Sequence, residues 1–221
     1  MLLIGMFDSP YVRRCAISLK LLKLPFEHAN WSVGVDHASI REHSPLGRVP
    51  ALVLDNREVL VDSASILDHL DDVVGPGHAL LPASGSARRD ALRIIANAIG
   101  AAEKAREILY EKLVRPVEKR HEPWVERCRS QMHGALGQVE IACARRGLGE
   151  WLVADSLTQA DVTAACVFTF LVEALRICDE GTSRYPRLKA LTARCEELPE
   201  FRATHLAWFA FAAQTASNAR S

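Results

Sequence analysis

The sequence lacks several features that would each define a class of protein. It has no excess of charge of either sign, since 27 Lys and Arg residues balance 27 Asp and Glu residues among 221 positions. This balance gives no indication of nucleic acid or an anionic membrane as a partner. No apolar run reaches the length of about 18 residues that a membrane helix needs. Asp8 interrupts the first apolar run early and no basic segment precedes it, so we expect no signal peptide.

Paired cysteines and metal-binding motifs are also missing. The six cysteines form no CxxC pair, and most fall within helical patterns, as small core residues do (positions 15, 128, 143, 166, 178 and 195). We therefore expect a reduced, cytoplasmic protein without a disulfide framework. The eight histidines show no HExxH motif or cysteine–histidine cluster, so the sequence predicts no metal site. GxGxxG, P-loop and G-x-S-x-G motifs are absent too, which disfavours nucleotide-binding and serine hydrolase classes.

The first 76 residues alternate strand-like and helix-like segments. An apolar run at residues 2–6 predicts a buried strand, and the helical spacing of apolar residues after Pro10 predicts a helix. The following segments predict a strand at 26–31, a short helix at 36–43, a hairpin of strands at 51–54 and 58–61, and a helix opened by Asp62 and Ser63. This order predicts a small α/β domain.

A stretch rich in glycine, proline and serine at residues 75–86 marks the end of that domain. We place the first domain at 1–76, the linker at 77–86 and an all-helical domain at 87–221. A helix over 87–114 is expected to bury one face, made by Leu92, Ile95, Ile99 and Ala102.

The rest of the chain shows only helical patterns. The helix that begins at Pro123 has core candidates at three- or four-residue steps: Trp124, Cys128, Met132, Leu136, Val139 and Cys143. Thr158 and Asp161 resemble a capping box, and the run that follows, 162–178, is apolar almost all round. We therefore expect this run at the centre of the helical domain. A further helix is predicted at 185–198, and the aromatic segment 206–213 is expected to fold back over the bundle.

Ser9 stands where the first strand gives way to the first helix. Pro10 suits the first helical turn, where its missing N–H costs nothing, so Ser9 falls at the cap position with its hydroxyl facing solvent. The positive end of the helix dipole favours a negative charge held close to that hydroxyl. The alternative interpretation is an ordinary helix cap.

Four short stretches occur in a distinctive order. Residues 9–13 read SPYVR, residues 44–50 read SPLGRVP, residues 61–66 read VDSASI and residues 158–161 read TQAD. They resemble, in turn, the S-P-[FY]-V-R, N-P-x-G-K-V-P, [ED]-S-x-x-I and T-x-A-D motifs of cytosolic glutathione transferases, with the first typical of bacterial, serine-type members. The resemblance implies an α/β thioredoxin-like N-terminal domain followed by an all-α domain.

The resemblance also implies a role for each matched residue. Ser9 would be the catalytic residue, because its hydroxyl would donate to the sulfur of bound glutathione and favour the thiolate. Pro50 would be the cis-proline of thioredoxin-like folds and would expose the N–H and C=O of Val49 to the glutathione backbone. Asp62 would bind the γ-glutamyl ammonium and Ser63 the γ-glutamyl carboxylate. An ordinary N-cap is the alternative for both residues.

Neighbouring side chains have less specific expectations. Arg13 and Arg14 are expected to be solvated helix charges, with electrostatic help to the thiolate as the alternative. Arg48 stands where the family has Lys or Gln and could reach a glutathione carboxylate. Tyr11 is expected to line the second-substrate pocket. Cys15 is a rival nucleophile, but its place inside the helix predicts that it is buried.

The resemblance implies transfer of the glutathione thiolate to a small electrophilic, partly apolar substrate. Glutathione would be a co-substrate, with no metal, and the partners would include no nucleic acid and no membrane. Glutathione-dependent isomerisation or dehalogenation is an alternative activity, and a non-catalytic binding or regulatory protein is another. Members of the family are usually homodimers, so the resemblance also implies a homodimer. It implies a role in detoxification as well.

Overall fold

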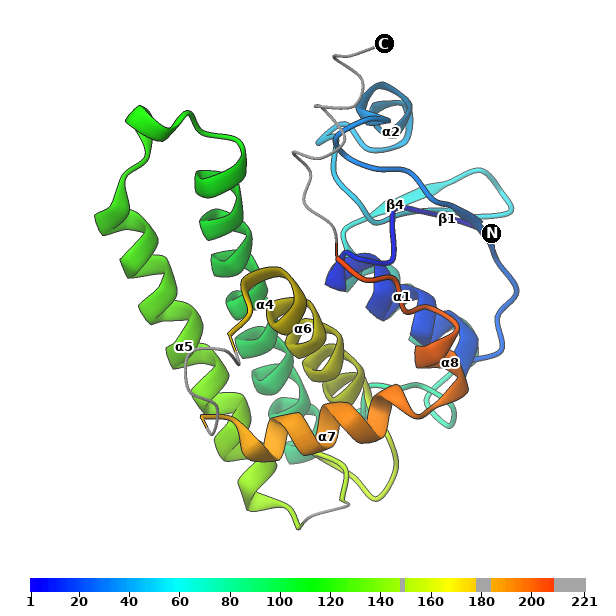
Figure 1. Ribbon diagram of the computed structural model, residues 1–221. Helices are drawn as coiled ribbons and strands as arrows, with labels where there is room; N and C mark the ends of the chain where they lie inside the picture. Colours follow the sequence, from blue (N-terminus) through cyan, green and yellow to red (C-terminus); the bar gives the residue numbers. More distant parts are fainter. Residues whose placement is uncertain (148–149, 178–183, 209–221) are drawn as a thin grey trace.

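Four short strands form one mixed sheet in the N-terminal part of the chain. The computed structural model describes residues 1–147, 150–177 and 184–208 (Figure 1). The strands lie in the order β2-β1-β3-β4, with the bounds β1 (Leu2–Ile4), β2 (Glu27–Ala29), β3 (Ala51–Val53) and β4 (Val59–Val61). β1 is parallel to β2, and the antiparallel pairs are β1 with β3 and β3 with β4. The parallel pair requires a crossover, which α1 (Pro10–Leu21) supplies.

Helices cover both faces of this sheet because successive strand side chains point to opposite faces. Leu3 and Leu52 point to the face covered by α1 and by α3 (Ser63–Val74). Ile4 and Ala51 point to the other face, where they meet Ile40 of α2 (His37–His43). The predicted α/β domain is therefore confirmed, with strands shorter than the sequence pattern predicts.

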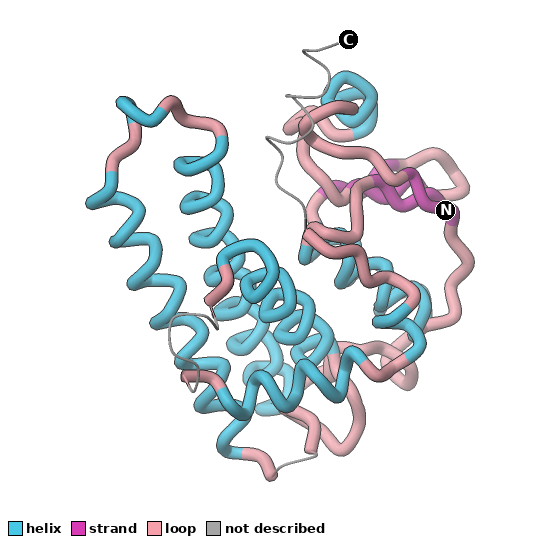
Figure 2. The backbone as a smooth tube through the Cα atoms, viewed as in Figure 1, coloured by secondary structure: helices cyan, strands magenta, loops and turns pink. Residues whose placement is uncertain are grey.

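The remaining elements are helical and lie beside the sheet domain, whose strands are drawn in magenta in Figure 2. Their bounds are α4 (Gly85–Leu113), η1 (Val117–Lys119), α5 (Glu122–Arg145), α6 (Gln159–Leu175), α7 (Pro186–Glu196) and α8 (Pro199–Arg202). α6 is the central helix, because it packs against α4, α7 and α1 and is buried over nearly its whole length. α1 thus lies between the sheet and the helices (Figure 1).

The start of α6 is fixed by the predicted capping box. The Thr158 N–H and hydroxyl donate to Asp161 Oδ2 at 2.9 and 2.8 Å, and the Leu152 N–H donates to Asp161 Oδ1 at 2.8 Å. Asp161 is fully buried, so these three donors replace its hydration. The central apolar helix is confirmed at 159–175, whereas Cys178 at its expected end lies outside the described residues.

Two details of the predicted helical core are wrong. Leu92 is exposed, and α4 instead buries a face displaced by about one residue, made largely of small side chains: Ala91, Ile94, Ala98, Ala101, Ala102 and Ala105. Alanines suit this face because they let α5 and α6 approach α4 closely. Trp124 is also 38 % exposed and lies against the Lys104 ammonium, while the other five core candidates of α5 are buried.

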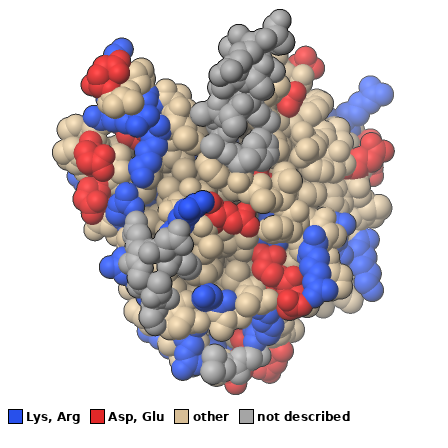
Figure 3. Space-filling model, viewed as in Figure 1, with Lys and Arg blue, Asp and Glu red and all other residues tan. Residues whose placement is uncertain are grey.

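Three further predictions concern the surface charge, membrane helices and the aromatic segment 206–213. On the face in Figure 3, side chains of both charge signs are interspersed around a broad uncharged area. Among the described helices, none combines the length and the apolar character that crossing a membrane would require. The predicted fold-back over 206–213 is described only to Trp208, and residues 209–213 lie outside the described part of the chain.

Candidate functional site

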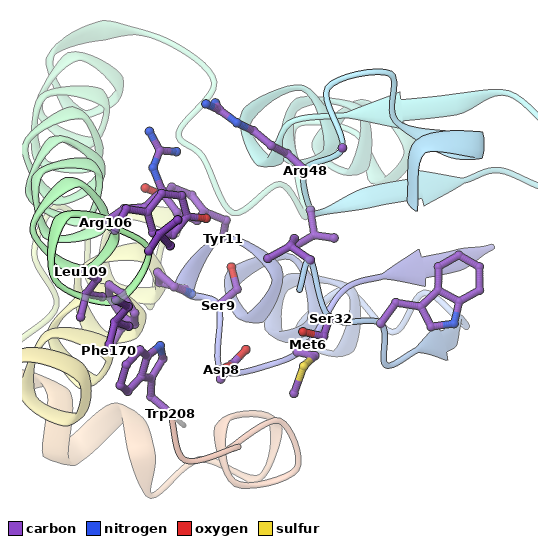
Figure 4. A pocket seen from close by; sticks show the side chains of 18 residues that line it. Met6, Asp8, Ser9, Tyr11, Ser32, Arg48, Arg106, Leu109, Phe170 and Trp208 are labelled. Atoms are coloured by element: carbon purple, nitrogen blue, oxygen red, sulfur yellow. The ribbon is translucent and has the colours of Figure 1, made fainter. Parts of the chain in front are cut away.

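Two adjoining cavities lie between the sheet domain and the helices. The first, which we call the serine cavity, has a volume of about 200 Å³ and contains Asp8 and Ser9 (Figure 4). The second, which we call the Asp62 cavity, has a volume of about 90 Å³ and contains Asp62 and Ser63. The two share four lining residues, so they are two parts of one cleft: Tyr11, Arg48, Val49 and Arg106.

Ser9 occupies the N-cap position of α1 with its side chain toward the serine cavity (Figure 4). Its backbone is extended (φ −76°, ψ 123°), and its carbonyl oxygen accepts from the Arg13 N–H at 2.9 Å. Its hydroxyl, however, makes no cap hydrogen bond to the helix. The predicted position at the helix start is confirmed, and the hydroxyl is not engaged in an ordinary side-chain cap.

Val49 lies at the junction of the two cavities. Its peptide bond to Pro50 is cis, as the sequence predicts. A Cβ on Gly5 would lie 2.7 Å from the Val49 Cβ and 2.6 Å from the Val12 Cγ2, so only glycine allows β1, α1 and this loop to meet. Val49 also makes no backbone hydrogen bond with the described residues, which leaves its N–H and C=O available to a ligand in the cleft.

Asp62 and Ser63 open α3 beside the Asp62 cavity. Asp62 has a positive φ of 72°, and its Oδ1 accepts from the Ala64 N–H at 2.7 Å, so it is a genuine N-cap. Its side chain nevertheless stays exposed at the cavity. Ser63 is 2 % exposed, and its hydroxyl oxygen accepts from Arg14 Nη2 at 2.7 Å.

The expectation that Arg13 and Arg14 are solvated is wrong, because each is only 3 % exposed. Arg13 donates to both Glu196 carboxylate oxygens at 2.8 and 2.6 Å and to the Phe201 carbonyl oxygen at 3.1 Å. Arg14 reaches Thr163 of α6 at 3.4 Å in addition to Ser63. These arginines are covered because α1 lies between two domains, a fact that the local helical pattern does not contain.

Cys15 is buried as predicted and is no rival to Ser9. Its side chain is completely buried, with Sγ 3.9 Å from the Ser63 carbonyl oxygen. Burial raises the pKa of Cys15 to about 12, although the neighbouring Arg14 charge opposes the rise. The thiol therefore stays protonated at neutral pH and is a poor nucleophile.

Tyr11 and Arg106 lie between the two cavities. Tyr11 lines the cleft as predicted, and its buried hydroxyl has no hydrogen-bond partner among the described residues. Burial raises the pKa of Tyr11 to about 12, so the phenol is neutral. Sequence reasoning missed Arg106, because a charged residue in a long helix gives no sign of facing a cleft.

Sequence reasoning also missed Asp8, which lines the serine cavity directly before Ser9. Burial raises the pKa of Asp8 to about 6, and the charge of Glu173 adds to the rise. Backbone N–H groups of Ser9 and Asp8 oppose it. The only available signal was an acidic residue beside the candidate catalytic serine.

Comparison with known proteins gives the same family for both domains. The glutathione S-transferase N-terminal domain matches residues 3–76, and the glutathione S-transferase C-terminal domain matches residues 122–194. A glutathione S-transferase from Methylobacterium radiotolerans, in complex with glutathione sulfonate, is 28 % identical with a TM-score of 0.84; the match covers 92 % of this chain and 93 % of that one.

Two further relatives agree. A glutathione transferase family member from Pseudomonas fluorescens, with bound glutathione, is 30 % identical with a TM-score of 0.76, covering 92 % of this chain and 98 % of that one. The uncharacterized GST-like protein YibF of Escherichia coli is 26 % identical over 171 residues, 77 % of this chain and 82 % of YibF. The protein therefore belongs to the glutathione S-transferase family. Membership of the serine-type subgroup stays a prediction.

Proposed function

We propose that the protein is a glutathione transferase in which Ser9 stabilises the thiolate of bound glutathione for attack on a small, partly apolar electrophile. The observation that carries this proposal is the Ser9 hydroxyl, which stands at the N-cap of α1, makes no cap hydrogen bond and lines the cleft. Glutathione bound to the Pseudomonas relative, and glutathione sulfonate bound to the Methylobacterium relative, support the choice of thiol.

Glutathione would lie across both cavities. The N–H and C=O of Val49 would pair with the cysteinyl backbone as an added strand does. Asp62, exposed at the cavity, would bind the γ-glutamyl ammonium. Ser63 accepts its hydrogen bond from Arg14, so its own proton is available to donate to the γ-glutamyl carboxylate, together with the N–H groups that open α3.

Ser9 would then act on the sulfur. A free thiol has a pKa of roughly 8.5 and is mostly protonated at neutral pH. Lowering that pKa by about two units requires about 2.7 kcal/mol of differential stabilisation. One hydrogen bond to a charged acceptor contributes roughly 1.5–3 kcal/mol, and the N-terminus of α1 adds the dipole of the helix. The thiolate would attack the electrophilic carbon, forming the C–S bond as the leaving group departs with its electron pair.

The electrophile would occupy the part of the serine cavity nearest the helices. Its walls there are apolar and come from α4, α6 and the segment after α8: Leu109, Leu113, Phe170 and Trp208. The domain boundaries 1–76 and 87–221 with the linker 77–86, and a cytoplasmic location, stay expectations from the sequence. A homodimer and a role in detoxification stay expectations from the family. Sedimentation at micromolar concentration tests the homodimer.

Replacement of Ser9 tests the proposal. Ser9→Ala should reduce the conjugation rate with an aryl halide about 10- to 100-fold at neutral pH, while the glutathione Kd from titration calorimetry changes less than about threefold. Ser9→Thr is the matched control, because it keeps a hydroxyl at the same position. An unchanged rate in Ser9→Ala contradicts the assignment. Absence of glutathione binding at millimolar concentration would instead support a non-catalytic protein.

A further inference from the structure

Asp8 and Ser9 project from adjoining positions of the β1–α1 loop toward the same cavity (Figure 4). Under the proposed function, the glutathione sulfur lies at Ser9 and therefore close to the Asp8 carboxyl. A carboxylate beside a forming thiolate opposes the ionisation that the Ser9 hydroxyl favours, because like charges in a cleft repel. The Asp8 carboxylate therefore disfavours thiolate formation, unless it takes part in the reaction by accepting the proton of the thiol.

The groups around Asp8 do not neutralise it by a direct ion pair. Glu173 of α6 adds negative charge, and it is itself occupied by His205 Nε2 and by the Trp208 N–H, each at 2.9 Å. On α1, the Arg13 guanidinium is bonded to Glu196.

Other charged or titratable groups come from other elements, among them Tyr110 of α4, which also lines the serine cavity. Arg48 of the loop before β3 and Arg106 of α4 line the serine cavity, and they also line the Asp62 cavity, where glutathione carboxylates would lie. Tyr11 is neutral. On β2, His28 stacks on Phe7 and lies 2.7 Å from the Gly5 carbonyl oxygen. No described residue forms a salt bridge with Asp8 at 4.0 Å or less.

We propose that Asp8 accepts the proton of the glutathione thiol, so that thiolate formation leaves the net charge of the cleft unchanged. The S–H bond breaks, an O–H bond forms on Asp8, and the sulfur keeps the electron pair. The carboxylate and thiol become a carboxylic acid and a thiolate, so no two negative charges stand side by side. This inference rests on the proposed function of Ser9 and assigns a second catalytic residue to the same site.

Two properties of Asp8 suit this role. Its partly buried position raises its pKa to about 6. The pKa of this carboxyl is therefore closer to that of the thiol than the pKa of an ordinary aspartate is. The protonated acid also remains beside the reacting atoms. Once the thiolate has displaced the leaving group, its negative charge is gone and the Asp8 acid, with its pKa of about 6, gives its proton to solvent, which restores the Asp8 carboxylate.

Proton release measured with a pH indicator distinguishes this mechanism from release to solvent. On mixing the enzyme with glutathione at pH 7.5, the wild type should form the thiolate, seen by its ultraviolet absorbance, with clearly less than one proton released for each thiolate, because the adjacent thiolate charge raises the pKa of Asp8 further above its value of about 6. Asp8→Asn should release about one proton for each thiolate formed, since it lacks the acceptor. Equal release by the two proteins would overturn the proposal.

The rates give a second test with the opposite sign for a merely repulsive carboxylate. Asp8→Asn should lower kcat/KM about tenfold or more if Asp8 is the base, and Asp8→Glu should restore part of the loss. An increase in kcat/KM for Asp8→Asn would show that the carboxylate only repels the thiolate and would overturn the proposal. Asp90→Asn, on the exposed surface of α4, is the matched control. Failure of the proposed role of Ser9 is distinguishable, because Ser9→Ala would then form as much thiolate as the wild type, whatever Asp8→Asn releases.

Discussion

The two sides of the cleft are built by different means. The sheet-domain side presents groups at the ends of backbone elements: a helix N-cap at Ser9, the peptide of Val49, and the N-terminus of α3 at Asp62. The helical side presents apolar side chains such as Leu109 and Phe170. Backbone groups fix a constant set of hydrogen bonds, whereas an apolar wall changes with any substitution. This difference indicates that the sheet-domain side suits a reactant that stays the same, and that the helical side suits a reactant that varies.

The largest effect is expected where the two sides are joined. Arg13→Met should lower the free energy of unfolding by about 3 kcal/mol, because it leaves the carboxylate of Glu196 partly buried without its ion-pair partner. Urea denaturation measures this loss. Glutathione binding and conjugation should weaken together, since the replaced contact joins α1 to α7.

Arg93→Met is the control, because Arg93 and Asp90 form an exposed ion pair within α4. A loss for Arg13→Met no larger than that of Arg93→Met would contradict the account.

The stability that the Arg13–Glu196 ion pair contributes depends on pH. Burial alone would raise the pKa of Glu196, but the bonds from Arg13 and Thr169 hold it below the ordinary value of 4.5. The pair therefore stabilises the fold above that pH and is lost as pH falls through the folded pKa.

Asp62→Asn should affect the sheet-domain side alone. Asn tolerates the positive φ and can still accept from the Ala64 N–H, so the substitution removes the charge and keeps the cap. We expect the glutathione Kd to rise about tenfold, equal to about 1.4 kcal/mol, by titration calorimetry. Asp68→Asn, exposed on α3, should leave the Kd unchanged. A Kd unaffected in Asp62→Asn would remove Asp62 from the binding site.

Trp208→Ala should affect the helical side alone. Its indole lines the serine cavity while its backbone N–H is held by Glu173, so truncation removes apolar surface without removing that hydrogen bond. The KM for an aromatic electrophile should rise about fivefold, with the glutathione Kd unchanged. Trp124→Ala, on the surface of α5, should change neither constant. A change in glutathione affinity for Trp208→Ala would show that the two sides are not separate.

Asp8 lies between the two sides and should give the smallest effect, on stability. Its pKa is raised from 3.8 to about 6, so the folded chain holds the proton more tightly and loses stability as pH rises between those values. Asp8→Asn does not titrate and should be about 1 kcal/mol more stable than the wild type above pH 6, after allowance for partial exposure. Denaturation at pH 4 and pH 7 measures the difference. The same difference in stability between Asp8→Asn and the wild type at pH 4 and at pH 7 would contradict a raised pKa of Asp8.

The sequence alone predicts the sheet-domain side better than the helical side. Cap chemistry, which acts over a few residues, predicts Ser9 and Asp62 at helix starts, whereas Val49 follows from the resemblance to glutathione transferases. The structure brings the three residues to one cleft. Their roles stay predictions. The burial of Arg13 and Arg14 could not be predicted, because their partners Glu196 and Thr163 lie 183 and 149 residues away.

The helical core shows the same limit. The capping box of α6 is confirmed because it is local, whereas the buried face of α4 is displaced by about one residue. Helical periodicity fixes the spacing of a buried face but fixes its direction poorly when alanines and larger residues alternate around the helix. Leu92 is exposed and Ala91 buried because packing against α5 and α6 decides the direction.

The most direct measurement of the central claim is the pKa of the glutathione thiol in the complex, from thiolate absorbance across a pH titration. We predict a value about two units below the free thiol, returning toward the free value in Ser9→Ala and staying low in Ser9→Thr. A wild-type pKa equal to that of free glutathione, or a low pKa that persists in Ser9→Ala, would contradict the account.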